Sequence, residues 1–237
     1  MQNLSMTSKI CLSLKSLDGI DFRLISKIVG NLELRMDYLD FHSIEFNQIS
    51  HYFEYIILKI KDLQQLYDIY SVIIKENLSS KILYDVDLKL IKYGNIENIV
   101  LLDKINIIAS IHNVKYDNII HIIEKLKILG NYNKITFIKV VIQDDLIKYN
   151  KNLLQRIYNY SKNLINKDLI IFFEGENHTA SRYHSLLLGA PFIYCALNKS
   201  TQTGKGQPTI DEAFKMINLL RSFCKNNKPY YKKYPIG

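Results

Sequence analysis

The sequence lacks features that would place it in several common classes of protein. It has three cysteines among 237 residues, and Cys11, Cys195 and Cys224 form no Cys-x-x-Cys pair or cysteine–histidine cluster at zinc-ligand spacing. We therefore expect reduced thiols in a reducing compartment and no metal site. The polar N-terminal segment lacks the apolar core of a signal peptide, and no apolar run reaches the roughly 18 residues that a membrane span needs. These absences predict a cytoplasmic protein with no membrane partner.

Tryptophan is also absent, while isoleucine, asparagine, lysine and tyrosine are abundant, a composition typical of an AT-rich genome. The net charge is +8, but the lysines are scattered, and the only dense patch runs from Lys225 to Lys233. An excess of positive charge can attract nucleic acid, an acidic surface or small anionic substrates. The scatter argues against a nucleic-acid partner.

Proline and glycine are scarce, at four and nine residues, and no segment rich in them forms a linker. Hydrophobic residues make up 48% of the chain, which indicates a globular protein. We see no internal repeat. The sequence therefore predicts one domain over residues 1–225, followed by a basic tail over residues 226–237, for which disorder is one interpretation.

Apolar runs typical of strands alternate with helical patterns along the whole chain, which favours a single-domain α/β protein, the (β/α)8 TIM barrel. An open doubly wound sheet is the alternative, but no glycine-rich turn follows the first strand-like run. We expect strands at Ile10–Leu14, Leu32–Met36, Tyr55–Lys59, Ile82–Asp87, Ile105–Ser110, Ile135–Val140, Leu169–Phe173 and Phe192–Ala196. We expect helices at Asp21–Val29, Phe41–Ser50, Asp62–Glu76, Glu97–Asp103, Tyr116–Leu129, Asp144–Leu164, Thr179–Leu188 and Ile210–Cys224, the last capped by Thr209 and Glu212.

Lys139 lies near the C-terminal end of one expected strand, in a run rich in β-branched and aromatic residues. Burying an ammonium is costly, and desolvation lowers the pKa of a lysine. A neutral amine is a nucleophile that forms an imine with a ketone. The alternative interpretation is a strand-end lysine whose ammonium reaches water.

His112 follows the preceding expected strand. Neighbouring parallel strands lie about 4.8 Å apart, so His112 and Lys139 can converge on one ligand. A lysine nucleophile beside a histidine acid/base suits imine chemistry next to a carbonyl. By itself, a histidine at a strand end is more often structural than catalytic.

Other polar residues gather where the expected strands end, which is where barrel enzymes place their active sites. Glu33, Arg35 and Asp37 alternate along one strand and therefore share a face, either as ion pairs that brace the barrel mouth or as substrate contacts. Arg182, near a helix start, can hold a carboxylate with its planar fork, or can be a surface arginine. Residues 203–207 form a glycine-rich turn whose amide can hold hydroxyls, or a plain loop.

Taken together, these motifs resemble type I 3-dehydroquinate dehydratase, a Schiff-base enzyme of the shikimate pathway. The similarity runs from the first expected strand to the last helix. Its motifs are Glu33-Leu34-Arg35-Met36-Asp37, Ser110-Ile111-His112-Asn113, Ile138-Lys139, Ser181-Arg182, Gly189-Ala190-Pro191 and Gly206-Gln207-Pro208-Thr209-Ile210. Their order and spacing are more specific than any single motif.

The resemblance implies dehydration of 3-dehydroquinate to 3-dehydroshikimate, in aromatic amino acid biosynthesis, without a metal or organic cofactor. By analogy, Lys139 forms the imine, and His112 is the general acid/base. Substrate-binding roles fall to Ser13, Glu33, Arg35, Lys59, Arg182, Thr203 and Gln207. Of these, Arg182 is expected to hold the carboxylate, and Thr203 stands where the family usually has a serine. The resemblance also suggests a homodimer.

The sequence departs from the family around the third expected strand. The family usually has an arginine there, followed by a Glu-Gly-Gly loop, and here Lys59 or Lys61 replaces the arginine. The glutamate that normally orients the histidine has no clear counterpart. A glutamate of the fourth strand is shortened to Asp87, and Lys205 replaces a proline.

Other functions remain open at this point. Another class I imine-forming barrel, such as an aldolase acting on a small keto sugar, would more typically carry a phosphate-binding loop after the seventh and eighth strands. A catalytically decayed homologue retained as a binding protein is compatible with the altered third strand. A nucleic-acid binder would lose affinity steeply with salt.

Overall fold

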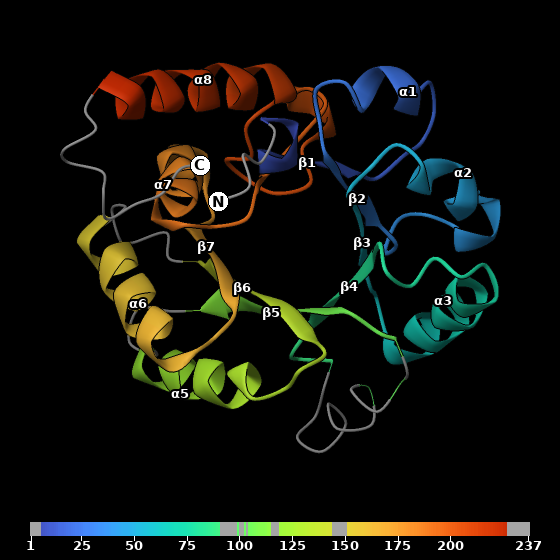
Figure 1. Ribbon diagram of the computed structural model, residues 1–237, viewed down its shortest axis with the longest axis horizontal. Helices are drawn as coiled ribbons and strands as arrows, with labels where there is room; N and C mark the ends of the chain where they lie inside the picture. The colour runs from blue at the N-terminus through green and yellow to red at the C-terminus, as the bar shows by residue number, and fades with distance from the viewer. Residues whose placement is uncertain are drawn as a thin grey trace.

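Eight parallel strands form the centre of the protein. The computed structural model describes residues 6–90, 99, 102, 104–114, 119–143 and 151–226. The strands are hydrogen-bonded in the order β7-β6-β5-β4-β3-β2-β1-β8 and curl around a common axis (Figure 1). They are β1 (Ile10–Leu14), β2 (Asn31–Arg35), β3 (Tyr55–Lys59), β4 (Ile82–Asp87), β5 (Ile107–Val114), β6 (Ile135–Ile142), β7 (Asp168–Phe173) and β8 (Ile193–Cys195).

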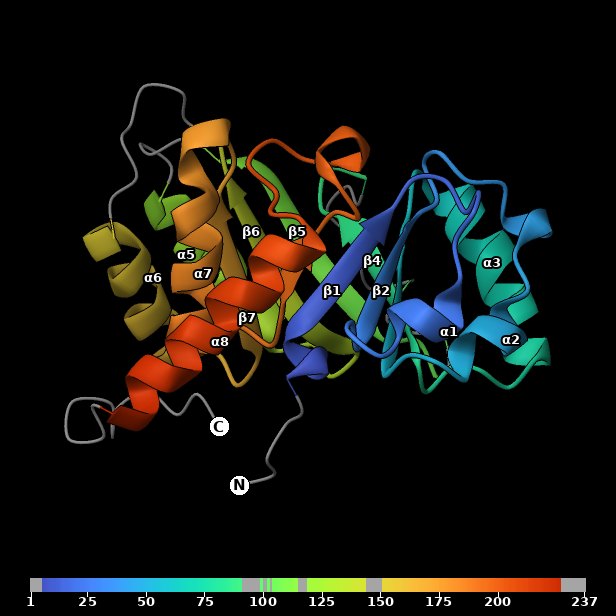
Figure 2. The same ribbon diagram turned by 90° about the horizontal axis from the view of Figure 1, so that it is seen from above.

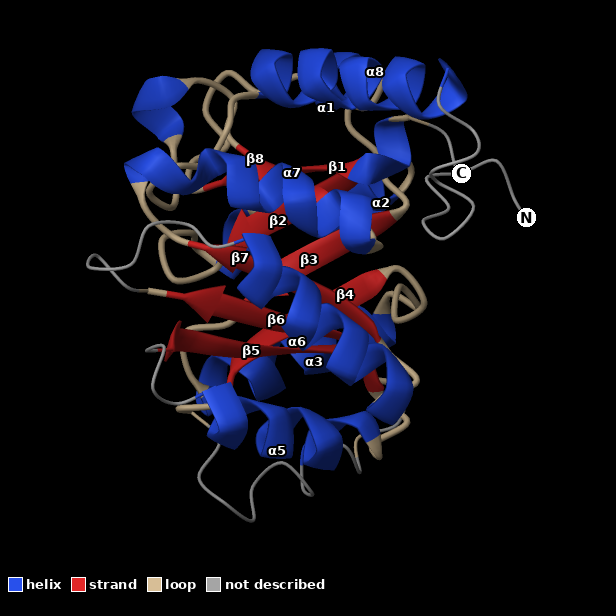
Figure 3. Cartoon of the chain, turned by 90° about the vertical axis from the view of Figure 1, so that its left-hand side faces the viewer, coloured by secondary structure: helices blue, strands red, loops and turns tan. Residues whose placement is uncertain are grey.

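Helices alternate with the strands and cover the outside of the curled sheet (Figures 2 and 3). They are α1 (Phe22–Ile25), α2 (Phe46–Ser50), α3 (Leu63–Lys75), α5 (Ile119–Gly130), α6 (Lys151–Leu164), α7 (Thr179–Leu188) and α8 (Ile210–Asn226). Short 3-10 helices occur at Thr7–Lys9, Phe41–Ser43, Glu176–His178 and Lys199–Thr201. None of the helices in the described ranges is long and apolar enough to span a membrane.

The predicted (β/α)8 barrel fold is confirmed, and a strand occupies each of the eight expected places. β1, β3 and β4 have the expected bounds, as does α7. The predicted capping box also forms, because Thr209 N donates to Glu212 Oε2 and Glu212 N donates to Thr209 Oγ1. The expected helix over 97–103 lies almost entirely outside the described residues, as do residues 116–118, residues 144–150 and the basic tail from residue 227.

β5 differs from the prediction because it continues beyond Ser110 to Val114. The pairing with β6 shifts between Ile111, opposite Val140, and Val114, opposite Ile142. Asn113 has a φ of 56°, a left-handed conformation that asparagine tolerates better than most residues, and it takes up the irregularity. His112 therefore lies inside an irregular part of the strand rather than after its end.

The two expected helices before β3 are shorter than predicted. After α1, Lys27 N and Ile28 N donate to carbonyls three residues earlier, so the chain winds as tight turns before β2. The expected helix over 41–50 is divided into a 3-10 helix and α2. Neither difference changes the positions of the strand ends that carry polar residues.

The buried apolar residues form two clusters. The larger one packs the strands against the surrounding helices. The smaller one alternates with it along the strands and fills the barrel interior, where Phe137 and Phe192 meet edge-to-face with ring centroids 5.7 Å apart. Its members are Cys11, Ile57, Leu83, Ile108, Phe137, Val141, Ile170, Phe172, Phe192 and Tyr194. Most of this cluster lies below the polar residues described next, and Val141, Phe172 and Tyr194 lie beside them.

Candidate active site

A polar layer lies above the interior apolar layer, toward the C-terminal ends of the strands. Side chains two positions apart in a strand share a face, so the residues that follow the apolar layer also point inward. Thus Ser13 follows Cys11, and Asp85 follows Leu83. The other members are Glu33, Lys59, Ser110, His112 and Lys139. The strand pattern alone therefore gathers ionisable groups at one end of the barrel.

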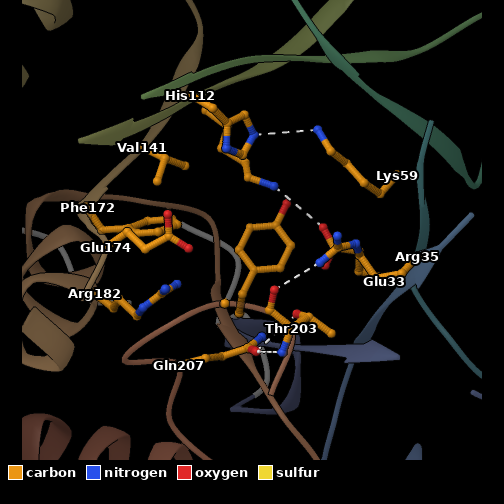
Figure 4. Close-up of a pocket in the computed structure, with 13 residues that line it drawn as sticks. Glu33, Arg35, Lys59, His112, Val141, Phe172, Glu174, Arg182, Thr203 and Gln207 are labelled. Carbon is orange, nitrogen blue, oxygen red and sulfur yellow. Dashed lines mark hydrogen bonds and ion pairs between the residues drawn. The ribbon is translucent and has the colours of Figure 1, made fainter. Parts of the chain in front are cut away.

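Four of these residues, Glu33, Lys59, His112 and Lys139, line a cavity of about 180 Å³ (Figure 4). Eight of the nine predicted site residues line it, namely Glu33, Arg35, Lys59, His112, Lys139, Arg182, Thr203 and Gln207. The ninth, Ser13, contacts two of them: its hydroxyl donates to Glu33 Oε2 and lies 2.8 Å from Thr203 Oγ1. The structure therefore brings the predicted constellation together.

Asp85 is at the centre of this layer and is fully buried. Lys139 Nζ donates to Asp85 Oδ2 at 2.5 Å, and Lys59 Nζ donates to Asp85 Oδ1 at 2.9 Å. Ser110 Oγ also donates to Oδ1. Burial alone raises the pKa of Asp85, but the two ammonium groups outweigh burial and hold that pKa far below its usual range. Asp85 is therefore an anion that binds both lysines.

Lys139 is 6% exposed and reaches the cavity between two carboxylates. Its Nζ is 3.5 Å from Glu33 Oε1, and it lies 4.4 Å from the ring centroid of Tyr194. Burial lowers the pKa of Lys139, but Asp85 and Glu33 more than offset this, and the net direction is upward. The expectation of a lowered lysine pKa is therefore wrong. Lys139 rests as an ammonium that must lose a proton before it can act as a nucleophile.

His112 has the opposite electrostatic environment. Burial, followed by the positive charges of Lys139 and Lys59, lowers the pKa of the imidazole to about 3. Its Nε2 lies 3.5 Å from Lys59 Nζ. His112 is consequently neutral at physiological pH, which is the state that a general base requires.

A hydrogen-bond network on the other side of the cavity joins β1 and β2 to the loop after β8. Thr203 Oγ1 lies 3.1 Å from Gln207 Oε1, and Arg35 Nη1 donates to Thr203 O at 3.1 Å. Arg35 also forms a two-pronged ion pair with Asp37, at 2.8 and 2.6 Å. Asp37 follows the end of β2. Arg35 therefore both forms the ion pair predicted to brace the barrel mouth and lines the cavity.

Arg182 comes from α7 and is 5% exposed. Its guanidinium lies over the Phe172 ring, 4.0 Å from the centroid, and Nη2 donates to Lys205 O at 3.2 Å. Burial lowers the pKa of Arg182 to about 10, so it remains a cation at neutral pH. Its Nε is buried, and no hydrogen-bond partner for it occurs among the described residues. A positive group with an unsatisfied N–H is suited to an anionic ligand.

The sequence did not reveal several residues of the site. The sequence assigns the carboxylate of the fourth strand to Asp87, but Asp85 is the residue that binds Lys59 and Lys139. Asp87 lies at the end of β4 and accepts from Lys89 N. Tyr194 and Glu174 line the cavity and are absent from the predicted site. Alternation along β4 was the available signal, because Asp85 and Asp87 share one face. Of the two lysines considered for the third strand, Lys59 lines the cavity, whereas Lys61 is exposed.

A second and larger cavity, about 1020 Å³, opens at the N-terminal ends of the strands. Residues that line it include Lys9, Tyr55, Phe137 and Asp168. None of the predicted site residues lines it, so the predicted chemistry belongs to the C-terminal end of the barrel.

Comparisons with known proteins identify a family and support the fold. A family model described as type I 3-dehydroquinase matches residues 25–223. Among curated proteins, none matches the chain. The 3-dehydroquinate dehydratase structure from Geobacillus kaustophilus HTA426 has a TM-score of 0.69 at 14% identity, covering 91% of this chain and 92% of that one. The 3-dehydroquinate dehydratase structure from Aquifex aeolicus VF5 has a TM-score of 0.63 at 18% identity, covering 90% of this chain and 98% of that one. The type I 3-dehydroquinate dehydratase structure from Clostridium difficile has a TM-score of 0.62 at 15% identity, covering 92% of this chain and 94% of that one. At these identities, the structures support the fold.

Proposed function

Because the chain belongs to the type I 3-dehydroquinase family, we propose that it dehydrates 3-dehydroquinate to 3-dehydroshikimate through an imine on Lys139. One observation carries the proposal of mechanism. A buried lysine, a neutral histidine and a buried arginine with an unsatisfied N–H line the same cavity. These are the nucleophile, the base and the carboxylate binder that the reaction needs.

The reaction begins with proton loss from Lys139. Asp85 and Glu33 lie 2.5 and 3.5 Å from Nζ, so one of these carboxylates can take the proton and return it to the hydroxyl that later leaves the carbinolamine as water. The free amine attacks the carbonyl carbon, and the resulting carbinolamine loses water to give an iminium. The positively charged iminium withdraws electrons and acidifies the neighbouring C–H.

Neutral His112 then takes the proton from that carbon. The electron pair of the C–H bond forms the new double bond, and the C–O bond to the β-hydroxyl breaks. The hydroxyl leaves as water with the proton that His112 returns. Hydrolysis of the iminium releases the product and regenerates Lys139.

Binding of the substrate is divided between the two sides of the cavity. Arg182 holds the carboxylate through charge-assisted hydrogen bonds, with its Nε among the donors. Glu33, Arg35 and Gln207 lie across the cavity near Ser13 and Thr203, where they can bind the ring hydroxyls. Tyr194 and Phe172 provide apolar walls.

Turnover of 3-dehydroquinate tests this proposal, because the product is a conjugated enone that can be followed by ultraviolet absorbance. We expect turnover by the wild-type protein and none by Lys139→Met, with circular dichroism to establish that both are folded. A folded wild-type protein that leaves 3-dehydroquinate unchanged contradicts the proposal and favours a decayed binding protein.

A further inference from the structure

Lys59 has two hydrogen-bonding contacts, one with His112 and one with the carboxylate that also binds Lys139. Its Nζ is 3.5 Å from His112 Nε2 (Figure 4) and 2.9 Å from Asp85 Oδ1. An ammonium has three donors and no acceptor. The ring nitrogen that faces it must therefore accept, which means that Nε2 carries no proton.

The position of Lys59 is fixed from both sides. Lys59 and Asp85 are partners in the β3–β4 register, and the Lys59 side chain is 14% exposed. Lys139 occupies Oδ2 of Asp85 and Lys59 occupies Oδ1. Among the described residues, Lys59 Nζ is also the hydrogen-bond partner of the His112 ring, and no carboxylate is bonded to that ring. An ammonium, rather than a carboxylate, therefore orients this imidazole.

We propose that Lys59 is a positioning residue that holds His112 as the neutral Nδ1–H tautomer, with Nε2 accepting from Lys59 until substrate displaces that contact and frees the lone pair. This inference rests on the proposed function for its catalytic meaning, but the tautomer itself does not depend on substrate. In this arrangement, Asp85 places Lys59, and Lys59 places His112. The same carboxylate thus sets the positions of the nucleophile and of the base.

The charges around His112 come from three strands and favour the neutral ring. Lys59 on β3, Lys139 on β6 and Lys89 after β4 oppose its protonation, and Asp85 on β4 favours it. Burial adds to the effect of the cations. Removing the Lys59 charge therefore raises the His112 pKa, whereas replacing it with another cation does not.

Histidine ¹⁵N NMR of the full chain without substrate tests the proposal, with the His112 signals assigned from His112→Gln. The variants are Lys59→Met, Lys59→Arg and Lys59→Gln, and Lys61→Met is the matched control on the exposed neighbour. We expect the wild-type protein and Lys61→Met to show the Nδ1–H tautomer and no titration above pH 5. Lys59→Met should lose the preference for that tautomer and raise the titration midpoint by about one unit or more. Lys59→Arg should preserve both.

Unchanged His112 signals in folded Lys59→Met overturn the inference. If Lys59→Met does not fold, Lys59→Gln supplies the same test, because it keeps a donor and removes the charge. There, a raised midpoint supports the inference, and a wild-type midpoint overturns it.

Activity measurements separate this inference from the proposed function. In wild-type protein that turns over 3-dehydroquinate, the acid limb of kcat/KM should move to higher pH in Lys59→Met and remain in place in Lys59→Arg. A variant that raises KM alone, without a change in tautomer or acid limb, shows that Lys59 only binds substrate. If the wild-type protein has no turnover, the proposed function fails, while the NMR result still decides whether Lys59 positions His112.

Discussion

Lys139 Nζ and Asp85 Oδ2 are 2.5 Å apart in the barrel interior, with both residues buried. Asp85 also binds Lys59, so one carboxylate compensates two ammonium groups. Removing one partner of a buried ion pair leaves an uncompensated charge, which costs about 3–5 kcal/mol. The stability of the site and its chemistry therefore depend on the same residue.

The first prediction concerns Asp85→Asn. We expect the free energy of unfolding to fall by about 3 kcal/mol or more, because two buried cations lose their anion. Denaturant unfolding measures this, with Asp87→Asn as the matched control on the same strand but outside the cavity. The control should change stability by less than about 1 kcal/mol, because asparagine can still accept from Lys89 N. Equal losses for both variants contradict the role of Asp85.

The second prediction concerns the acid side of the stability profile. The pKa of His112 is lowered to about 3 in the folded protein and is about 6.5 in an unfolded chain. As pH falls through this window, the unfolded state binds a proton that the folded state does not, so His112 reduces stability. His112→Gln should therefore lose less stability than wild type between pH 6.5 and 3. Urea unfolding at each pH checks this, with His51→Gln as the control at an exposed position.

The third prediction concerns Arg182→Met. Loss of a charge-assisted contact to the substrate carboxylate costs about 1.5–3 kcal/mol, which corresponds to roughly a 10- to 150-fold rise in KM. Steady-state kinetics measures the effect, with Arg156→Met as the control at an exposed position on α6. An Arg182→Met enzyme with wild-type KM shows that the carboxylate binds elsewhere.

The fourth prediction concerns the Thr203 hydroxyl, which lies 2.8 Å from Ser13 Oγ and 3.1 Å from Gln207 Oε1. Thr203→Ser keeps the hydroxyl and should retain kcat/KM within about twofold. Valine is close in size to threonine, but Thr203→Val removes the hydroxyl that Ser13 and Gln207 contact. The value of kcat/KM should therefore fall roughly tenfold. The two variants measured side by side separate the hydroxyl from the methyl, and equal values for both exclude a role for the hydroxyl.

The fold could be predicted because strand-like runs and helical patterns alternate without long interruptions. Lys139 and His112 could be placed because each lies near the end of such a run. The choice between Asp85 and Asp87 could not be made in the same way, since both face inward, and only the register that pairs Lys59 with Asp85 distinguishes them. The pKa direction of Lys139 was also out of reach, because it depends on two carboxylates from other strands.

Trapping the covalent intermediate tests the central claim most directly. The protein is incubated with 3-dehydroquinate and borohydride, which reduces a C=N bond to a stable amine, and is then studied by intact and peptide mass spectrometry. Lys139→Met and a sample without borohydride are the controls. The account predicts a reduced adduct on the peptide that contains Lys139, and none in either control. A folded, active wild-type enzyme with no adduct, or with the adduct on Lys59, contradicts it.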